Sequence, residues 1–219
     1  MSDINPGFIF IALVVLAFSL SFHEMAHAWT AYRLGDPTAY NEGRVSLNPV
    51  VHVDPIGTIL FPLAGLLFAA AGTRVPLIGW AKPVPFLVRN LSRPRRDVIL
   101  IALAGPASNI LLAIVIAILW RLLAFVPPVD QSIGQPIAMF LVIGIYSNLG
   151  LAIFNLLPIP PLDGGRIVVG LLPNRLAYRF ARIEPFGFFI VIGLMVAGLL
   201  GFLINPFYDL GMSIVSLFN

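Results

Sequence analysis

Long apolar stretches alternate with short polar and proline-rich connections along this chain. Four of the apolar stretches are long enough to cross about 30 Å of hydrocarbon as helices, which rise about 1.5 Å per residue. They cover residues 8–34, 98–124, 137–157 and 186–204. The pattern predicts an all-α polytopic membrane protein, built as a bundle of four to six transmembrane helices.

A fifth apolar stretch, residues 56–72, is at the short limit for a membrane span. It follows Asp54-Pro55 and contains Pro62, so it is either a full span or a re-entrant segment that enters the membrane and returns. The last apolar stretch, residues 207–218, is too short to cross alone. We expect it to lie along the membrane interface.

The connections between the first span and residue 98 have a different character. Residues 43–58 and 79–91 are rich in β-branched residues and punctuated by prolines, which predicts short β-like strands near the membrane. An unpaired strand edge there would be a template for an extended peptide. An ordinary interfacial loop fits the same residues equally well.

Composition places the chain among membrane proteins. It has 219 residues, of which 59% are hydrophobic and 11% charged, and no basic face that would bind nucleic acid. Without cysteine, any zinc ion must be held by histidine and carboxylate. The first residues lack the basic region of a removable signal peptide. We expect a single integral-membrane domain over residues 1–219, with its motifs within 8–170 and C-terminal helices in 171–219.

The first apolar stretch contains the sequence His23-Glu24-Met25-Ala26-His27. At positions i and i+4 the two histidines lie one turn apart on the same helix face and can reach one zinc ion. Glu24 is then placed to act on a water molecule that the metal activates. Ionisable groups at bilayer depth cost several kcal/mol unless they are paired or bound. A metal site therefore explains the histidines better than a role in core packing does.

A catalytic zinc ion takes a third protein ligand and leaves one position for water. The candidates are His52, Asp54, Asp36, Glu42 and Asp163. We favour Asp163, because prolines at 158, 160 and 161 break the helix before it and two glycines after it allow a tight turn. A carboxylate held at the end of an apolar span is costly without a cation. His52 and Asp54 lie in a polar loop where a turn role suffices.

Three motifs together resemble the site-2 protease family of intramembrane zinc metalloproteases, peptidase family M50. They are HEMAH at 23–27, GPASN at 105–109 and NLLPIPPLDGG at 155–165. The resemblance implies one zinc ion, held by His23, His27 and Asp163, with Glu24 as the catalytic glutamate. No segment has the character of the PDZ or CBS domains of some relatives, so we expect a minimal form of the family.

Two asparagines receive roles from the same resemblance. It implies that Asn155 positions the substrate or stabilises the oxyanion, and that Asn109 is a substrate-binding residue near the site. Both could instead be amides that bridge helices, as is common in membrane proteins.

Depth and charge predict the orientation. His23 lies about 15 residues, or roughly 22 Å, from the start of its helix. It reaches the depth of Asp163, at the inner end of the third long span, only if the first helix starts outside. That orientation requires residues 56–72 to be re-entrant, which we favour. It also places twelve of the thirteen basic residues on the cytoplasmic side, with Arg121 as the exception, against ten if residues 56–72 span.

These observations predict an intramembrane zinc endopeptidase of the cell membrane, with its active site toward the cytoplasmic side. Its expected partners are the lipid bilayer and single-span membrane proteins, cleaved in or near their transmembrane segments. The alternative is a zinc transporter that uses the same His and Asp cluster. Glu24 distinguishes them, because hydrolysis needs a carboxylate beside the metal and transport does not.

Overall fold

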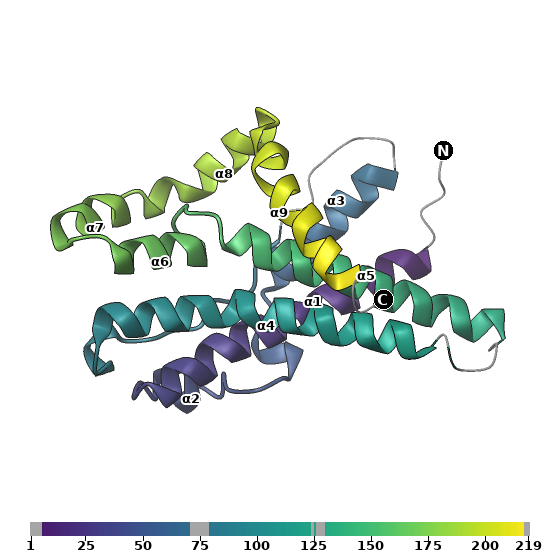
Figure 1. Ribbon diagram of the computed structural model, residues 1–219, viewed down its shortest axis with the longest axis horizontal. Helices are drawn as coiled ribbons and strands as arrows, with labels where there is room; N and C mark the ends of the chain where they lie inside the picture. The colour runs from purple at the N-terminus through teal and green to yellow at the C-terminus, as the bar shows by residue number, and fades with distance from the viewer. Residues whose placement is uncertain (1–5, 71–78, 124, 126–129, 217–219) are drawn as a thin grey trace.

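Three long helices form the body of the protein. The computed structural model describes residues 6–70, 79–123, 125 and 130–216. α1 (Pro6–Arg33), α4 (Pro94–Leu123) and α5 (Gln131–Asn155) are each long and apolar enough to cross a membrane. α1 and α5 run in one direction and α4 runs in the opposite one (Figure 1). The prediction of an all-α polytopic membrane protein is confirmed.

Small side chains allow α4 to pack closely against α5. Ala113 and Ala117 of α4 are fully buried against Leu141 and Ile145 of α5. Lipid tails are as apolar as these residues, so close van der Waals packing, rather than exclusion of water, holds membrane helices together. α4 also packs against α1 and against α6 (Asp163–Leu171). It therefore fixes the relative positions of the elements that carry the predicted ligands.

Shorter elements complete the described chain. They are α2 (Thr38–Asn41), η1 (Pro49–Val51), η2 (Pro55–Leu60), α3 (Phe61–Ala70), η3 (Val88–Asn90), α7 (Asn174–Ala181), η4 (Glu184–Phe186), α8 (Gly187–Val196) and α9 (Leu199–Ser216). α2, α6 and α7 lie at the end of the molecule where α4 begins, and α9 crosses over α5 (Figure 1).

The predicted fourth span, residues 186–204, is not one straight helix. α8 ends at Val196, and α9 begins at Leu199 with a bend of 90° between the two segments. Gly198 adopts φ +70°, a left-handed conformation that ends a helix and that glycine adopts at little cost. The described residues therefore give three spans, one fewer than the smallest predicted number, or four if the bent pair counts as one span. Residues 207–216 are not a separate interfacial segment but continue α9.

The described part of the predicted segment 56–72 is helical and follows directly from the loop before it. η2 and α3 carry the chain outward from Pro55. By residue 80 the chain is back at its starting point, because Trp80 N donates to Gly57 O at 3.1 Å and Thr58 Oγ1 donates to Trp80 O at 2.8 Å. A re-entrant segment requires ends that meet in this way. Residues 71–78 lie outside the described residues, so the re-entrant path stays a prediction.

The predicted β-like strands at 43–58 and 79–91 are wrong for the described residues, which contain no strand. The two segments do lie side by side, since Lys82 N donates to His52 O at 2.8 Å. A ladder does not follow, because prolines remove donors on both segments. The buried Arg44 guanidinium takes the carbonyls instead, with bonds to Val51 O, Lys82 O and Pro83 O.

His52 is a buried histidine that supports this loop pair. Its side chain is 1% exposed, and its Nε2 donates to Ser46 O at 2.7 Å. Burial, with the positive charge of Arg44 nearby, lowers the pKa of His52 from its ordinary value of 6.5. The folded protein therefore holds this imidazole neutral where an unfolded chain would protonate it.

This difference predicts that acidification destabilises the protein through His52. A histidine whose pKa is lower in the folded state binds its proton preferentially in the unfolded state, so stability falls as the pH drops below 6.5. We expect the thermal midpoint of the zinc-loaded protein to fall between about pH 7.5 and 5.5, and to fall less in His52→Gln, whose amide can still donate to Ser46 O. Scanning fluorimetry in detergent measures both. Equal slopes in the two proteins would contradict the prediction.

Candidate metal centre

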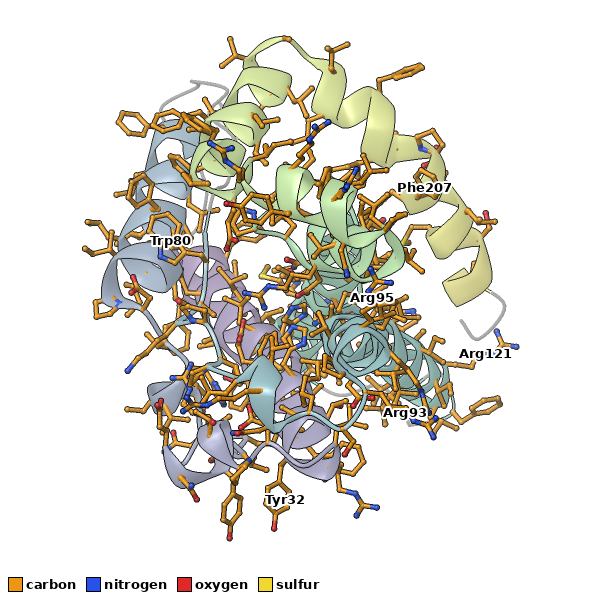
Figure 2. All side chains as sticks on the ribbon, turned by 90° about the vertical axis from the view of Figure 1, so that its left-hand side faces the viewer. Tyr32, Trp80, Arg93, Arg95, Arg121 and Phe207 are labelled. Carbon is orange, nitrogen blue, oxygen red and sulfur yellow. The ribbon has the colours of Figure 1, made fainter. Side chains whose placement is uncertain are left out.

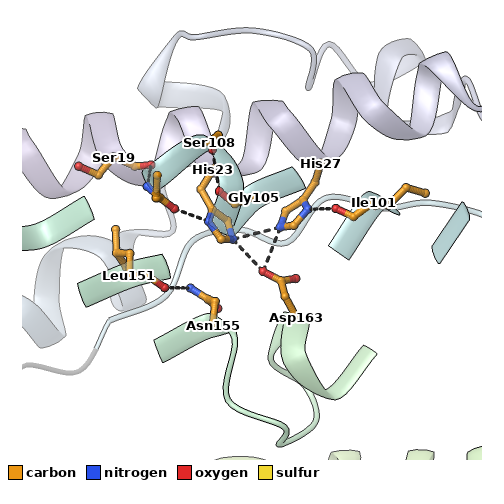
Figure 3. Close-up of polar contacts among 10 residues, drawn as sticks. Ser19, His23, His27, Ile101, Gly105, Ser108, Leu151, Asn155 and Asp163 are labelled. Atoms are coloured by element: carbon orange, nitrogen blue, oxygen red, sulfur yellow. Dashed lines mark hydrogen bonds and ion pairs between the residues drawn. The ribbon is translucent and has the colours of Figure 1, made fainter. Parts of the chain in front are cut away.

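The three predicted metal ligands meet at one point. His23 and His27 project from one face of α1, and Asp163 is the first residue of α6 (Figure 3). The two Nε2 atoms are 3.0 Å apart, and Asp163 Oδ2 lies 3.1 Å from His23 Nε2 and 3.3 Å from His27 Nε2. All three side chains are buried. The tertiary structure thus joins residues 140 positions apart in the sequence.

Hydrogen bonds behind the imidazoles fix which nitrogen faces this point. His23 Nδ1 lies 2.6 Å from Asn109 Oδ1, and His27 Nδ1 lies 2.7 Å from Ile101 O. Both partners are oxygen acceptors, so each Nδ1 carries the proton in a neutral ring. The Nε2 lone pairs then converge with the Asp163 carboxylate. The three converging atoms each offer a lone pair, and none of them carries a hydrogen. This is the set of ligand atoms that a cation requires.

The spacing suits zinc. Ligand atoms on a tetrahedral zinc ion, with bonds of about 2.0–2.1 Å, lie roughly 3.3–3.4 Å apart. The observed separations of 3.0, 3.1 and 3.3 Å are close to that value. Two imidazoles and one carboxylate leave a fourth position, as catalytic zinc sites do. His23, His27 and Asp163 therefore form a cluster that can hold one zinc ion.

Gly105 gives the imidazoles their room. A Cβ built at this position of α4 would lie less than 3.0 Å from both the His23 and the His27 ring. Real Cβ contacts are essentially never that short. The sequence motif GPASN can be explained by a helix kink at Pro106, but the structure shows that its glycine is needed for clearance at the metal centre.

A compact turn brings Asp163 to the histidines. α5 ends at Asn155, and the proline-rich segment 156–162 reverses the chain before α6 begins. A Cβ at Gly164 would contact the carbonyl oxygens of Leu156 and Leu157, and one at Gly165 would contact Pro160. Only glycine allows the start of α6 to approach this turn so closely. The prediction that a broken helix presents the carboxylate is confirmed.

Glu24 and Asn155 border a small pocket next to the ligands. Its volume is about 110 Å³, room for several water molecules. Asn155 Nδ2 donates to Leu151 O at 2.9 Å, which leaves its second N–H hydrogen unassigned (Figure 3). The pocket is lined by His23, Glu24, His27, Pro83, Val84, Phe86, Asn155, Pro161, Leu162, Asp163 and Arg166. Glu24 and Asn155 are thus where a general base and a carbonyl-binding group would act, and these roles stay predictions.

Asn109 lies outside the pocket lining, and its predicted substrate-binding role stays a prediction. It is 0% exposed, lies behind His23 and is not among the residues that line the pocket. Its Oδ1 faces His23 Nδ1, and its Nδ2 donates to Asn148 Oδ1 at 2.8 Å and to Ser19 O at 3.2 Å. These contacts make it a positioning residue for His23, and direct substrate binding by Asn109 has no support from them.

Asn148 extends the network to a third helix. Its Nδ2 donates to Ser19 Oγ at 2.9 Å and to Gly144 O at 2.8 Å, so Asn109, Asn148 and Ser19 link α4, α5 and α1 behind the metal centre. Each buried amide is satisfied, which holds Asn109 with its oxygen toward His23. Asn148 belongs to none of the sequence motifs. An isolated asparagine in a span commonly bridges helices, so its position alone did not indicate a role at the metal centre.

Removal of this support should weaken metal binding. Asn148→Leu keeps the branching at Cγ but removes one of the two acceptors of Asn109 Nδ2, which leaves only Ser19 O to hold the amide with its oxygen toward His23. Loss of a residue behind a metal ligand typically costs 10- to 100-fold in affinity. We expect about a tenfold rise in zinc Kd, measured by competition with a chromophoric chelator, and no change in Ser147→Ala. Equal Kd values for Asn148→Leu and the unsubstituted protein would contradict the prediction.

The other candidate ligands have other partners. Asp36 accepts hydrogen bonds from Leu87 N at 2.6 Å, Asn90 Nδ2 at 2.7 Å and Thr38 Oγ1 at 2.6 Å, and holds two loops together. Asp54 caps η2 through Ile56 N and Gly57 N. His52 is bonded to Ser46 O, and Glu42 is exposed. Among the described residues, His23, His27 and Asp163 are the group that can hold a metal.

A buried two-histidine, one-carboxylate cluster among membrane-length helices defines an integral-membrane metalloprotein. The model of peptidase family M50 matches residues 122–198. A Bacillus subtilis (strain 168) protein named "Putative zinc metalloprotease YwhC" is 37% identical over 209 residues, which cover 94% of this chain and 90% of that protein. A Methanocaldococcus jannaschii protein of the same description, MJ0611, is 31% identical over 158 residues, which cover 72% and 69%.

A third relative, Rip2 of Mycolicibacterium smegmatis, has the same description. It is 33% identical over 178 residues, which cover 81% of this chain and 63% of that protein. No solved structure matches the chain. The chain belongs to peptidase family M50, the site-2 protease family that its motifs resemble, and is a multi-pass membrane zinc metalloprotease.

Proposed function

We propose that the protein is an intramembrane endopeptidase that hydrolyses peptide bonds in or near transmembrane segments of single-span membrane proteins. One observation carries the proposal: Glu24 and the three-ligand cluster share a pocket that admits water and lies among helices of membrane length. A soluble protease would not need its site there, because buried polar groups in a span are costly.

The residues of the pocket divide the chemistry between them. A bound zinc ion supplies Lewis acidity, which polarises a carbonyl and acidifies water. Glu24 accepts the proton of the attacking water and returns it to the leaving amine. Asn155 donates its second N–H hydrogen to the substrate carbonyl as negative charge develops on the oxygen. A helical substrate must unwind before it reaches them, because its carbonyls are occupied by helix hydrogen bonds.

Charge placement supports a site that opens toward the cytoplasm. Basic residues gather at the start of α4 and on α6 and α7, elements that lie at one end of the molecule in Figure 1, and Figure 2 looks onto that end. Arg121 is at the opposite end of α4. Basic residues favour the cytoplasmic side. Asp163 begins α6, and Arg166 of the same helix lines the pocket, so the pocket borders this basic group.

Purified protein in liposomes tests the proposal. We expect single-span peptides to be cut by the zinc-loaded protein, no cleavage after chelation, and restored cleavage after zinc is returned in a one-to-one ratio. A chelated sample measured in parallel for zinc content ties activity to the metal. Zinc uptake into the liposomes without cleavage of any peptide would favour the transporter alternative and overturn the proposal.

A further inference from the structure

Arg166 is a charged residue of the pocket that the proposed chemistry does not use. It follows Asp163 by one helical turn in α6 and lines the pocket with Glu24 and Asn155. Residues three apart on a helix have Cβ atoms about 5–6 Å apart. The Arg166 side chain therefore starts one helical turn from Asp163, on the pocket side of α6.

An aromatic ring orients the guanidinium. Arg166 Cζ lies 5.5 Å from the centre of the Phe86 ring, and Phe86 also lines the pocket. Phe86 is itself anchored, because it packs against the buried residues Ala31, Leu91 and Ile101. Stacking on an aromatic face holds a guanidinium plane and leaves the N–H groups at its edge free for bidentate bonds.

No described residue uses those N–H groups. Within the described ranges, the backbone N of Arg166 donates to Leu162 O at 3.2 Å, but its guanidinium has neither a hydrogen bond nor an ion pair. Its counterparts differ: Arg44 bonds three backbone carbonyls, and Arg95 bonds Leu172 O at 3.1 Å and Asn174 Oδ1 at 2.6 Å. The Arg166 guanidinium is thus held beside the proposed reaction site, and no described residue accepts a hydrogen bond from it.

We propose that Arg166 forms a carboxylate-binding subsite that selects substrates with a carboxylate close to the scissile bond. This inference rests on the proposed peptidase function. A planar guanidinium matches a carboxylate through two parallel hydrogen bonds. An extended peptide advances about 3.3–3.6 Å per residue. The carboxylate therefore belongs to a glutamate or aspartate within about two residues of the bond, or to a free carboxyl terminus at that distance.

Peptide binding to a catalytically inactive variant tests the subsite without relying on turnover. In the Glu24→Gln background, fluorescence anisotropy compares peptides with Glu or Gln at each of two positions on either side of the target bond, and peptides with a free or an amidated carboxyl terminus. We expect one carboxylate peptide to bind about tenfold more tightly than its neutral counterpart, as a charge-assisted bidentate pair provides. The position of the preference tells side chain from terminus.

Three variants complete the test. Arg166→Gln, added to the Glu24→Gln background, should abolish the preference for a carboxylate. Arg166→Glu in the same background should reverse the preference toward a Lys peptide. Arg179→Gln should keep the preference, because Arg179 is an exposed arginine of α7 that does not line the pocket. Zinc content should stay the same in all three. Equal binding of every carboxylate and neutral pair, or a preference that survives Arg166→Gln, would overturn the subsite. If the unsubstituted protein cuts no peptide, the peptidase proposal fails. The anisotropy measurement still shows whether the pocket prefers a carboxylate, so the two proposals are tested separately.

Discussion

Glu24→Gln should leave the zinc ion in place and slow peptide cleavage by about 100- to 10,000-fold, the usual contribution of a general base. The amide has nearly the same shape as the carboxylate but cannot accept the proton of the attacking water. Glu24 is not one of the three ligand residues, so the metal centre keeps its donor set. The measurement is kcat/KM on a single-span peptide, with bound zinc determined on the same samples.

Glu42→Gln is the matched control, because Glu42 is exposed and is not among the residues that line the pocket. Its kcat/KM should equal that of the unsubstituted protein. A Glu24→Gln protein that cleaves at the normal rate with a full complement of zinc would remove Glu24 from the mechanism. A Glu24→Gln protein that lacks zinc would show instead that the carboxylate supports the metal centre.

Gly105→Ala should cost the protein at least about 100-fold in zinc affinity, beyond the usual loss from a residue that only supports a ligand. The added methyl would overlap both imidazole rings, since its carbon would lie under 3.0 Å from His23 and His27. The rings cannot both turn aside without breaking their bonds to Asn109 Oδ1 and Ile101 O. Competition with a chromophoric chelator measures the zinc Kd, and cleavage should fall in parallel.

Gly150→Ala provides the matched control within another long helix. A Cβ at Gly150 meets nothing within 4 Å, so the change adds only helix propensity, about 1 kcal/mol in favour of alanine. Zinc affinity should stay unchanged there. Circular dichroism should show the same helix content for both variants, so that lost metal binding is not lost folding. Normal zinc affinity in Gly105→Ala would mean that the rings need no clearance from α4.

The site was largely predictable because burying ionisable side chains in a membrane-spanning segment costs free energy. Histidines at i and i+4 within an apolar run have few reasons to exist in lipid other than a metal. Asp163 could be proposed as the third ligand because prolines and glycines around it mark a break in a span. Gly105 and Asn148 could not be assigned, because a glycine in a span also fits a kink and an asparagine also fits any helix contact.

Errors arose where the local pattern did not settle the tertiary partners. Residues 43–58 and 79–91 have strand-like composition, but strands need donors and free acceptors opposite each other. Their prolines remove donors, and Arg44 occupies the carbonyls. The predicted span at 186–204 is uniformly apolar. Its hydropathy therefore gives no sign of the bend between α8 and α9, where Gly198 adopts a left-handed conformation.

The sequence by itself determined the membrane class, the three long helices, the candidate metal ligands and the break that presents Asp163, because each follows from hydrophobic length or from the cost of charge in lipid. Only the tertiary structure decided how α1, α4, α5 and α6 meet, which places Gly105 against both imidazoles and Asn109 behind His23. It also decided that Arg166 faces the pocket over Phe86. These relations depend on contacts between residues far apart in the chain, which local pattern and spacing do not specify.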